Sequence, residues 1–426
     1  MRLLACTMVV CGCFHPAPPA GIPCGTNGEC PGDQICDMQL SPPTCVDSLT
    51  PGDGGAGDMG PPGDSPSGVD APPPGACIAD ADCSNGICHE LTGACVPDAE
   101  VLFVSPSGSG SACSRMAPCG ALQTAIDERT QNRFTIALAA GTYSTSFDTS
   151  MMPGGVNQMI VSGPTRAWDG AVITSSAMNR VHQQLTAVFE GLTIRGGSST
   201  SGDGINSRGT TTLSRVHIDL AGDDGVVCAD GTTKISDSLI TKSANTGIFA
   251  SSGKLVVERT QVVSNEAYGI HVDNAAYSIT NTIIASNGKA LMQTGGVRLR
   301  GAGSAGDTAV FRFNTTARNQ GLSFAAIQCD DPTAISNTIV GEQSVVSPLV
   351  SPACTATYSL FNAGFGGPPP GTGNITGDPM FVSTTDFHLQ SGSPAIDKAD
   401  PNAPEPIDID GQQRSSPPDI GADERQ

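Results

Sequence analysis

Apolar and polar positions alternate through the middle of the chain, and the pattern repeats every 22 residues. One apolar strip starts in successive repeats at Leu213, Ile235, Val257 and Ile279. A second strip, in which Gly precedes an apolar residue, runs in phase from Gly225, Gly247 and Gly269. The first strip extends less regularly to Phe189 upstream and to Phe311 and Ile335 downstream. Each unit therefore predicts two or more short strands separated by turns that contain Gly, Asn or Asp.

A repeat of this length has no room for a crossover helix and cannot bury its apolar face alone. Stacking solves both problems, because equivalent strands then pair in parallel about 4.8 Å apart. The repeat predicts an all-β protein built as a parallel β-helix, and it resembles the right-handed, pectate-lyase-like family. That resemblance implies a single-stranded coil of about 22 residues. A leucine-rich solenoid is the alternative, but it requires Leu at positions where this chain has few.

The segments that flank the repeat resemble the two ends of bacterial surface β-helix proteins. Residues 101–127 and 136–144 are similar to their entry, which implies a first strand, a cysteine loop and a helix over 121–126. A helix there would cap the exposed strand edges at the open end of the coil. Residues 378–397 and 408–424 are similar to their C-terminal tail, which implies the last coil and a second cap.

Composition and charge change abruptly before the repeat. The 426 residues carry a net charge of −20, from 21 Lys and Arg against 41 Asp and Glu. Residues 14–98 contain twelve of these acids and no Lys or Arg. The acidity argues against nucleic acid as a partner, because binding phosphates requires a positive field. Residues 46–76 have almost no apolar side chains and are predicted to form a disordered linker.

The N-terminus resembles a bacterial lipoprotein signal, in which Val10-Cys11-Gly12-Cys13 follows a short aliphatic run. The resemblance implies lipidation of Cys13, and a protein held in the cell envelope at the outer membrane or surface. An ordinary secretory signal is the alternative. No stretch reaches the roughly 18 apolar residues that span a bilayer. We therefore expect contact with a membrane only through a lipid anchor.

Two short modules within the acidic segment share a four-cysteine plan. Their cysteines are Cys24, Cys30, Cys36 and Cys45 in the first and Cys77, Cys83, Cys88 and Cys95 in the second. Each module has about 20 residues, too few for a hydrophobic core, which predicts two disulfides in each. Three pairings per module stay open. Zinc is the less favoured alternative, since C-x2-C pairs are absent.

The cysteines of the repeat region predict two further bridges. Cys113 and Cys119 are close in sequence, and Cys329 and Cys354 would lie on adjacent coils. Cys228 remains unpaired at an inward position of the second strip. A buried free thiol is favoured there over a reactive site.

These patterns divide the chain into seven predicted segments. They are a signal with lipobox at 1–13, a linker at 14–23, a cysteine-rich module at 24–45, the linker at 46–76, a second module at 77–95, the β-helix at 99–395 and a C-terminal cap or tail at 396–426.

The candidate chemistry is acidic. Asp203 on one coil and Asp223 and Asp224 on the next occupy the same turn, so the three carboxylates should lie near one another. Paired carboxylates serve as acid and base in glycoside hydrolysis. The turns Asp203-Gly204-Ile205 and Gly222-Asp223-Asp224 resemble those of polygalacturonase-type hydrolases, which implies catalytic roles for the three acids.

The next coils depart from that family. The Gly-His-Gly turn and the Arg-x-Lys strand are replaced by Asn245-Thr246-Gly247 and Ala267-Tyr268-Gly269, and His271 lies one coil further on. A polysaccharide lyase would instead need calcium carboxylates and a Lys or Arg base. We favour a turn role for the acids over a cation or sugar site, and both over catalysis. The tail's Asp408-x-Asp410-Gly411 is likewise interpreted as a turn rather than a calcium loop.

Two functions remain open. The favoured one is a non-catalytic surface protein for binding, adhesion or envelope structure, with an extracellular polysaccharide or cell-surface component as its partner. The alternative is a hydrolase or lyase that acts on acidic glycans through Asp203, Asp223 and Asp224. We expect a monomer without metal or other cofactor, calcium being the one candidate ion.

Overall fold

The computed structural model describes residues 35–37 and 44–46 and most of the chain from residue 77 to residue 426. Within 77–426 the residues left undescribed are 78, 90–91, 150–154, 166, 176, 197–201, 290–294, 302–308, 322–325, 342–349 and 363–367. Several predictions fall outside the described residues. They are the signal with Cys13, the linker 14–23, the linker 46–76 beyond Val46, and the bonding of Cys24, Cys30 and the side chains of Cys36 and Cys45. The chain divides into two units, Met1–Ala71 and Pro72–Gln426.

The first unit contains one described hairpin. Strand β1 (Ile35–Asp37) pairs antiparallel with β2 (Thr44–Val46), and Cys36 lies opposite Cys45 in the register.

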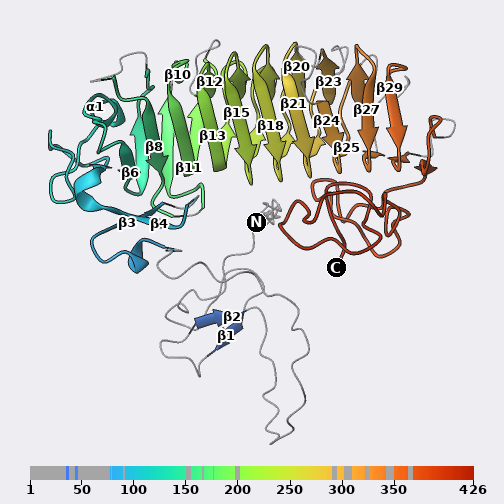
Figure 1. Cartoon of the computed structure of the whole chain (residues 1–426), viewed down its shortest axis with the longest axis horizontal. Coiled ribbons are helices and arrows are strands. Elements are labelled where there is room, and N and C mark those ends of the chain that lie inside the picture. The colour runs from blue at the N-terminus through green and yellow to red at the C-terminus, as the bar shows by residue number, and fades with distance from the viewer. Residues whose placement is uncertain are drawn as a thin grey trace, which may run out of the picture. The chain divides into compact units, whose positions relative to one another are not determined.

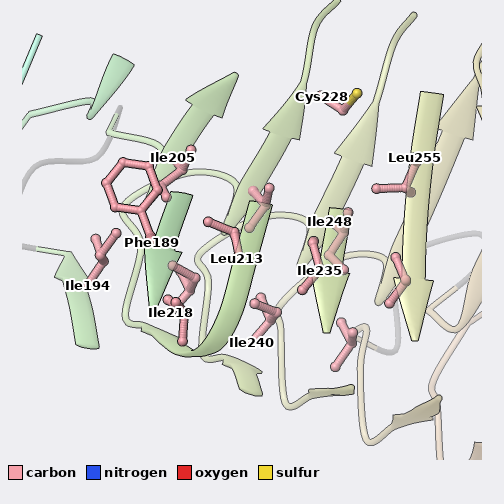
Figure 2. Packing of buried hydrophobic residues seen from close by; sticks show 14 of the residues in the cluster. Phe189, Ile194, Ile205, Leu213, Ile218, Cys228, Ile235, Ile240, Ile248 and Leu255 are labelled. Carbon is pink, nitrogen blue, oxygen red and sulfur yellow. The ribbon is translucent and has the colours of Figure 1, made fainter. Parts of the chain in front are cut away.

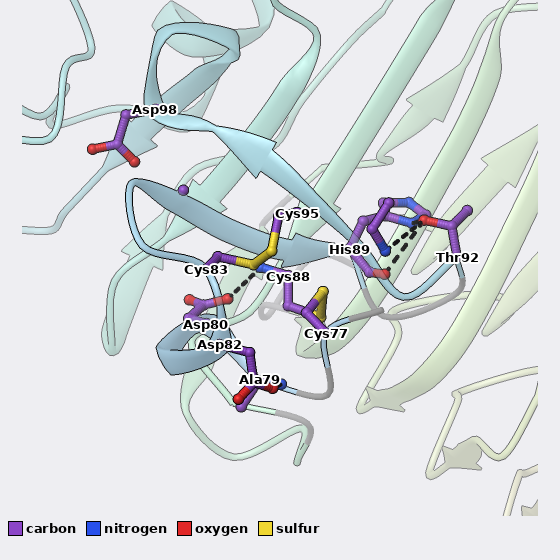
Figure 3. Close-up of a disulfide and its surroundings, with 12 residues drawn as sticks. Cys77, Ala79, Asp80, Asp82, Cys83, Cys88, His89, Thr92, Cys95 and Asp98 are labelled. Atoms are coloured by element: carbon purple, nitrogen blue, oxygen red, sulfur yellow. Dashed lines mark hydrogen bonds between the residues drawn. A yellow bond between two sulfur atoms is a disulfide. The ribbon is translucent and has the colours of Figure 1, made fainter. Parts of the chain in front are cut away.

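The second cysteine module opens the other unit (Figure 3). Its elements are the 3-10 helix η1 (Asp80–Asp82) and the antiparallel strands β3 (Gly86–His89) and β4 (Ala94–Pro97), followed by η2 (Asp98–Glu100). Disulfides join Cys77 to Cys88 and Cys83 to Cys95, which confirms two bridges in this module and excludes these cysteines as zinc ligands.

The predicted parallel β-helix is confirmed, and its strands form three parallel sheets that run along the coils (Figure 1). The first sheet contains β5 (Val101–Val104), β6 (Thr135–Leu138), β8 (Gln158–Ser162), the first half of β11 (Thr186–Gly196), the first half of β13 (Thr210–Asp219), β15 (Thr232–Ser236), β18 (Lys254–Glu258), β21 (Ala276–Thr280), β24 (Ala309–Arg312), β27 (Thr333–Ser336) and β29 (Cys354–Thr357).

The second sheet follows the first after a single-residue corner. It contains β7 (Gly141–Ser144), β9 (Ala171–Ser175), the second halves of β11 and β13, β16 (Leu239–Thr241), β19 (Gln261–Val263), β22 (Ile283–Ala285), β25 (Thr315–Ala317), β28 (Ile339–Gly341), β30 (Leu360–Phe361) and β31 (Ile375–Thr376).

The third sheet completes each coil. It contains β10 (Arg180–Val181), β12 (Ile205–Ser207), β14 (Val226–Cys228), β17 (Ile248–Ala250), β20 (Ile270–Asp273), β23 (Val297–Arg300) and β26 (Ile327–Cys329).

The register that the 22-residue period predicts is the one in the structure. Leu213 pairs with Ile235, Ile235 with Val257, and Val257 with Ile279. These side chains are fully buried, and like residues stack along the axis (Figure 2). The parallel coil thus turns one short apolar strip per repeat into a continuous core.

The corner between the first and second sheets is one residue with left-handed backbone. Its φ angle is +50° at Asp237, +47° at Asn281 and +49° at Asn337, residue types that adopt this conformation at low cost. The same corner also holds Arg259 at +43° and Phe313 at +52°. The stacked coils thus impose left-handed backbone on residues whose intrinsic preference disfavours it.

Buried asparagines tie successive coils together at the end of the second sheet. The Asn287 Oδ1 atom accepts hydrogen bonds from the backbone N–H and the side-chain amide of Asn265, at 3.0 and 2.9 Å. Its own amide donates to the Val262 carbonyl at 2.8 Å, and Asn319 repeats the arrangement one coil on. This ladder satisfies backbone groups that the turn would otherwise leave without partners.

The predicted N-terminal helix is present as α1 (Leu122–Asp127). It buries Leu122, Ala125 and Ile126 in the same apolar cluster as the first coils. The predicted bridge between Cys113 and Cys119 closes the loop before it.

The two other cysteine predictions for the repeat region are also confirmed. A disulfide joins Cys329 to Cys354 in adjacent coils. Cys228 is buried and unpaired, and burial raises the pKa of its thiol.

The C-terminal tail lies against the outer face of the second sheet. Residues 377–426, all of them described, contain no helix or strand. Apolar tail residues pack on outward side chains of β22, β25, β28 and β30 in one cluster; they include Phe381, Phe387, Leu389, Ile409 and Ile420. The Glu405 carboxylate accepts a hydrogen bond from Arg312 at 2.7 Å, and Arg414 donates to Asn281 at 2.8 Å. The tail therefore covers one side of the last coils.

Candidate functional site

The structure brings the three predicted acids together. Asp203 precedes β12, and Asp223 and Asp224 precede β14, the next strand of the third sheet. One carboxylate oxygen from each residue lies within 4.8 Å of the others. The close approach follows from the register, because Ile205 pairs directly with Val226.

Two of the three carboxylates are engaged in the turns themselves. Asp203 and Asp224 are only 6 % and 7 % exposed, whereas Asp223 is partly exposed. Asp203 Oδ2 accepts a hydrogen bond from the Asn206 amide at 2.8 Å, and Asp224 Oδ1 accepts one from the Thr246 backbone N–H at 2.8 Å. The first bond links Asp203 to a side chain of β12, and the second links Asp224 to the backbone of the next coil.

Burial and mutual repulsion disfavour ionisation of the cluster. Burial is the main reason that the pKa of Asp224 rises to about 7, and the charges of Asp223 and Asp203 add to it. Burial likewise raises the pKa of Asp203, against the hydrogen bond from Asn206. The cluster thus contains a carboxyl group that holds its proton near neutral pH.

In the described turns of the next two coils, no basic residue is in register with these acids. These two turns hold Thr246 and Tyr268. Arg180, on the preceding strand of the third sheet, acts on the Asp203 carboxylate through its charge. The nearby lysines belong to other contacts, since Lys234 pairs with Glu258 at 3.1 Å and Lys242 with Asp219 at 3.8 Å. The cluster therefore provides carboxyl groups of the kind that glycoside hydrolysis uses as acid and base.

A second group of side chains lies on the outer face of the third sheet. Phe249 pairs in register with His271, and His271 with Arg298. The ring of His271 lies 5.1 Å from that of Phe249 and 4.7 Å from that of Tyr268, centroid to centroid. All four side chains are partly exposed. We call Phe249, Tyr268, His271 and Arg298 the aromatic strip.

The strip also carries a charged partner. Arg298 lies 2.8 Å from Asp330, and its side chain bonds to Tyr268. Burial lowers the pKa of His271, with the charge of Arg298 acting in the same direction, so its imidazole is neutral at pH 7.

The tryptophan and tyrosines taken alone are scattered along the chain and do not predict this strip. The available signal was the period: Phe249 and His271 are 22 residues apart at the outward position next to the buried Ile248 and Ile270. Outward residues one period apart become neighbours in a β-helix as surely as inward ones do.

The Asp408-x-Asp410-Gly411 loop has the contacts of a turn. Asp408 is fully buried, and its carboxylate accepts hydrogen bonds from the backbone N–H groups of Asp410, Gln412 and Glu424 at 2.8–3.1 Å. Asp408 would be the first ligand of a calcium loop, and these contacts already engage its carboxylate.

Comparison with known proteins agrees with the fold. Residues 167–305 match the family model described as "Right handed beta helix region". No curated protein matches the chain. Among solved structures, "Crystal structure of pectate lyase Pel9A" is similar with a TM-score of 0.46 and 15 % identity, over 76 % of this chain and 96 % of that one. The central coils are thus similar in sequence to a right-handed β-helix region, and the structure shows them as a parallel β-helix.

In the part of the chain that the structure describes, no helix is both long and apolar enough to cross a membrane.

Proposed function

We propose that this protein is a non-catalytic surface protein of the bacterial cell envelope that binds a polysaccharide along the outer face of the third sheet. The aromatic strip is the observation that carries the proposal. Partly exposed rings on a rigid sheet offer stacking surface to sugar rings, and the neighbouring Arg298 offers hydrogen-bond donors to hydroxyl groups.

The charge of the coils favours a neutral polysaccharide. Residues 99–426 contain 20 Lys and Arg and 29 Asp and Glu, a net charge of 20 − 29 = −9. Asp203, Asp223 and Asp224 lie at the start of strands in the same sheet, so an acidic glycan would meet like charge there. A neutral glycan avoids that repulsion.

The acids support binding and turn formation better than catalysis. Glycoside hydrolysis needs two carboxyl groups that flank the scissile bond and reach the substrate. Asp203 and Asp224 are more than nine-tenths buried and accept hydrogen bonds from Asn206 and from Thr246 of the next coil, which leaves Asp223 as the accessible member.

Binding can be tested with the purified full chain against a panel of neutral and uronic polysaccharides by affinity electrophoresis and calorimetry. We expect retardation by at least one neutral polysaccharide, and a loss of at least about tenfold in affinity for Phe249→Ala and for Tyr268→Ala. Gln261→Ala is the matched control, because Gln261 is also partly exposed but faces outward from the second sheet. Equal affinity of the strip variants and wild type would refute the strip as the binding surface.

One observation favours the alternative function, a hydrolase or lyase. The protonated Asp224 and its two neighbouring acids are a combination that hydrolases use. Reducing ends and unsaturated products should therefore be measured on the same panel for wild type and Asp223→Asn. We expect neither product above background. Product formation by wild type that Asp223→Asn abolishes would establish catalysis in place of simple binding.

A further inference from the structure

A histidine and two aspartates converge in the tail, away from the aromatic strip and from the acids of the third sheet. His388, Asp410 and Asp423 each offer one ligand atom, and these atoms lie within 4.8 Å of one another. The three residues come from different parts of a 50-residue segment that has no helix or strand. Their convergence is therefore a product of the tail's own packing on the coils.

The imidazole of His388 is held in a fixed orientation. Its Nδ1 atom hydrogen-bonds to the Asp386 carboxylate, and its Nε2 atom lies 2.9 Å from Asp410 Oδ2. Histidines that bind metal ions commonly use one ring nitrogen for the ion and donate the other N–H to a carboxylate. Asp386 is placed to be that second carboxylate, and a bound ion would replace the proton through which Nε2 now bonds to Asp410.

The site has one buried ligand residue and two that are partly exposed. Asp423 is 5 % exposed, and its Oδ2 atom accepts a hydrogen bond from the Leu389 backbone N–H at 2.7 Å. The side chains of His388 and Asp410 are 34 % and 26 % exposed. An ion could reach the ligands from solvent, while the buried aspartate needs no reorganisation to meet it.

We propose that His388, Asp410 and Asp423 form a binding site for a divalent first-row metal ion, with Zn²⁺ as the representative ion. One imidazole nitrogen and two carboxylate oxygens suit zinc, whereas Ca²⁺ and Mg²⁺ prefer oxygen alone. Ligand atoms around tetrahedral zinc lie about 3.3 Å apart, for bonds of about 2.0 Å. The 2.9 Å contact and the 4.8 Å limit bracket that value. Water would complete the coordination.

A bound ion would hold the tail together. His388 follows the turn that brings Phe381 next to Leu389, Asp410 lies in the turn between Ile407 and Gln413, and Asp423 belongs to the last residues. Segments without regular secondary structure depend on such cross-links more than sheets do. The ion would act on the tail as the disulfides act on the cysteine module.

The acids of the third sheet offer a matched comparison within the same chain. Asp203, Asp223 and Asp224 also lie within 4.8 Å of one another, but they provide oxygen alone and no oriented imidazole. If acidity were sufficient for zinc, both clusters would bind it.

The test is a titration of the metal-free full chain with Zn²⁺, followed by calorimetry, and with Co²⁺, whose visible absorption reports tetrahedral coordination. We expect a site that stabilises the chain as Zn²⁺ is added, weakened about 10–100-fold by Asp386→Asn and more by His388→Gln. Asp223→Asn should leave it unchanged. Circular dichroism at saturating EDTA checks that each variant is folded.

Two results would overturn the proposal. One is the absence of saturable Zn²⁺ binding to the folded wild-type chain, which would make His388 and its aspartates an ion-pair cluster only. The other is binding that survives His388→Gln unchanged, since the ion would then bind elsewhere on the chain. The site is supported if His388→Gln and Asp410→Asn lose Zn²⁺ affinity to the same extent while Asp223→Asn keeps the affinity of wild type.

Discussion

The Oδ1 atom of Asp224 lies 2.8 Å from the backbone nitrogen of Thr246 and accepts a hydrogen bond from it, so a side chain of one coil holds the backbone of the next. The contact joins the turns that precede β14 and β17, two neighbouring strands of the third sheet. It also keeps a carboxyl group in a buried place, where ionisation is costly.

Asp224→Asn should stabilise the protein above neutral pH. The pKa of Asp224 rises from 3.8 to about 7 on folding, mainly through burial. Its contribution to stability is therefore complete below pH 3.8, falls as the pH rises towards 7 and is constant above. Asparagine keeps the acceptor for Thr246 without the charge, so we expect no change at pH 4 and a gain on the order of 2–4 kcal/mol at pH 8.

Urea unfolding at the two pH values measures this difference. Asp230→Asn is the control, because Asp230 is exposed and accepts a hydrogen bond within its own turn, from Gly231. A gain for Asp224→Asn that is the same at pH 4 and pH 8 would contradict the ionisation argument.

Asn287→Ala should destabilise the coils strongly. The substitution removes the acceptor of the Asn265 backbone N–H and the donor to the Val262 carbonyl, and Asn287 is fully buried. Buried groups left without partners cost about 1–3 kcal/mol each, which predicts a loss of about 2–5 kcal/mol in the free energy of unfolding. Asn402→Ala, at an exposed position of the tail, should change it by less than about 0.5 kcal/mol. Equal unfolding midpoints for the two variants would show that the ladder does not bear on stability.

Cys228 should be inert in the folded protein. Its side chain is fully buried and the pKa of its thiol is raised by burial, so little reactive thiolate forms. Wild type and Cys228→Ala should give the same number of thiols with a disulfide reagent under native conditions. In guanidinium chloride wild type should give one more. A difference already present in the native state would identify Cys228 as a reactive thiol.

The first cysteine module should have the connectivity of the second. In both, the last two cysteines lie opposite each other on an antiparallel pair, Cys36 with Cys45 and Cys88 with Cys95. In the second module these opposite cysteines bond to the two earlier ones instead of to each other. We therefore expect Cys24–Cys36 and Cys30–Cys45.

Mass spectrometry of non-reduced peptides distinguishes the three pairings. The second module serves as its own control, since peptides that link Cys77 to Cys88 and Cys83 to Cys95 should appear in the same digest. A peptide that links Cys36 to Cys45 would rule out the shared connectivity.

The central coils could be predicted from the sequence because their contacts repeat at a constant distance along the chain. Once Leu213 and Ile235 are recognised as equivalent, a parallel coil places one directly beside the other. A shift one residue shorter pairs Ile205 with Val226 and brings Asp203 close to Asp224. The burial of Cys228 and its place beside Ala250 follow from the same register.

The turns and the tail could not be predicted in this way. Arg259 and Phe313 adopt left-handed backbone because coils on either side leave that corner no other path, against their own preference. Ile420 of the tail and the outward-facing Ile339 of the second sheet pack in one cluster, but the sequence does not indicate that these two surfaces are in contact. Those contacts join parts of the chain that share no period.

The sequence by itself determined the repeat, the strand register, the cysteine bridges of the coils and the meeting of the three acids, since each depends on a local pattern carried forward by a constant spacing. Only the tertiary structure decided that Tyr268 joins Phe249 and His271 in a strip, and that His388 meets Asp410 and Asp423. The tail contacts arise from packing between non-repeating segments, for which burial and hydrogen bonding across the whole fold, and not spacing, select the partners.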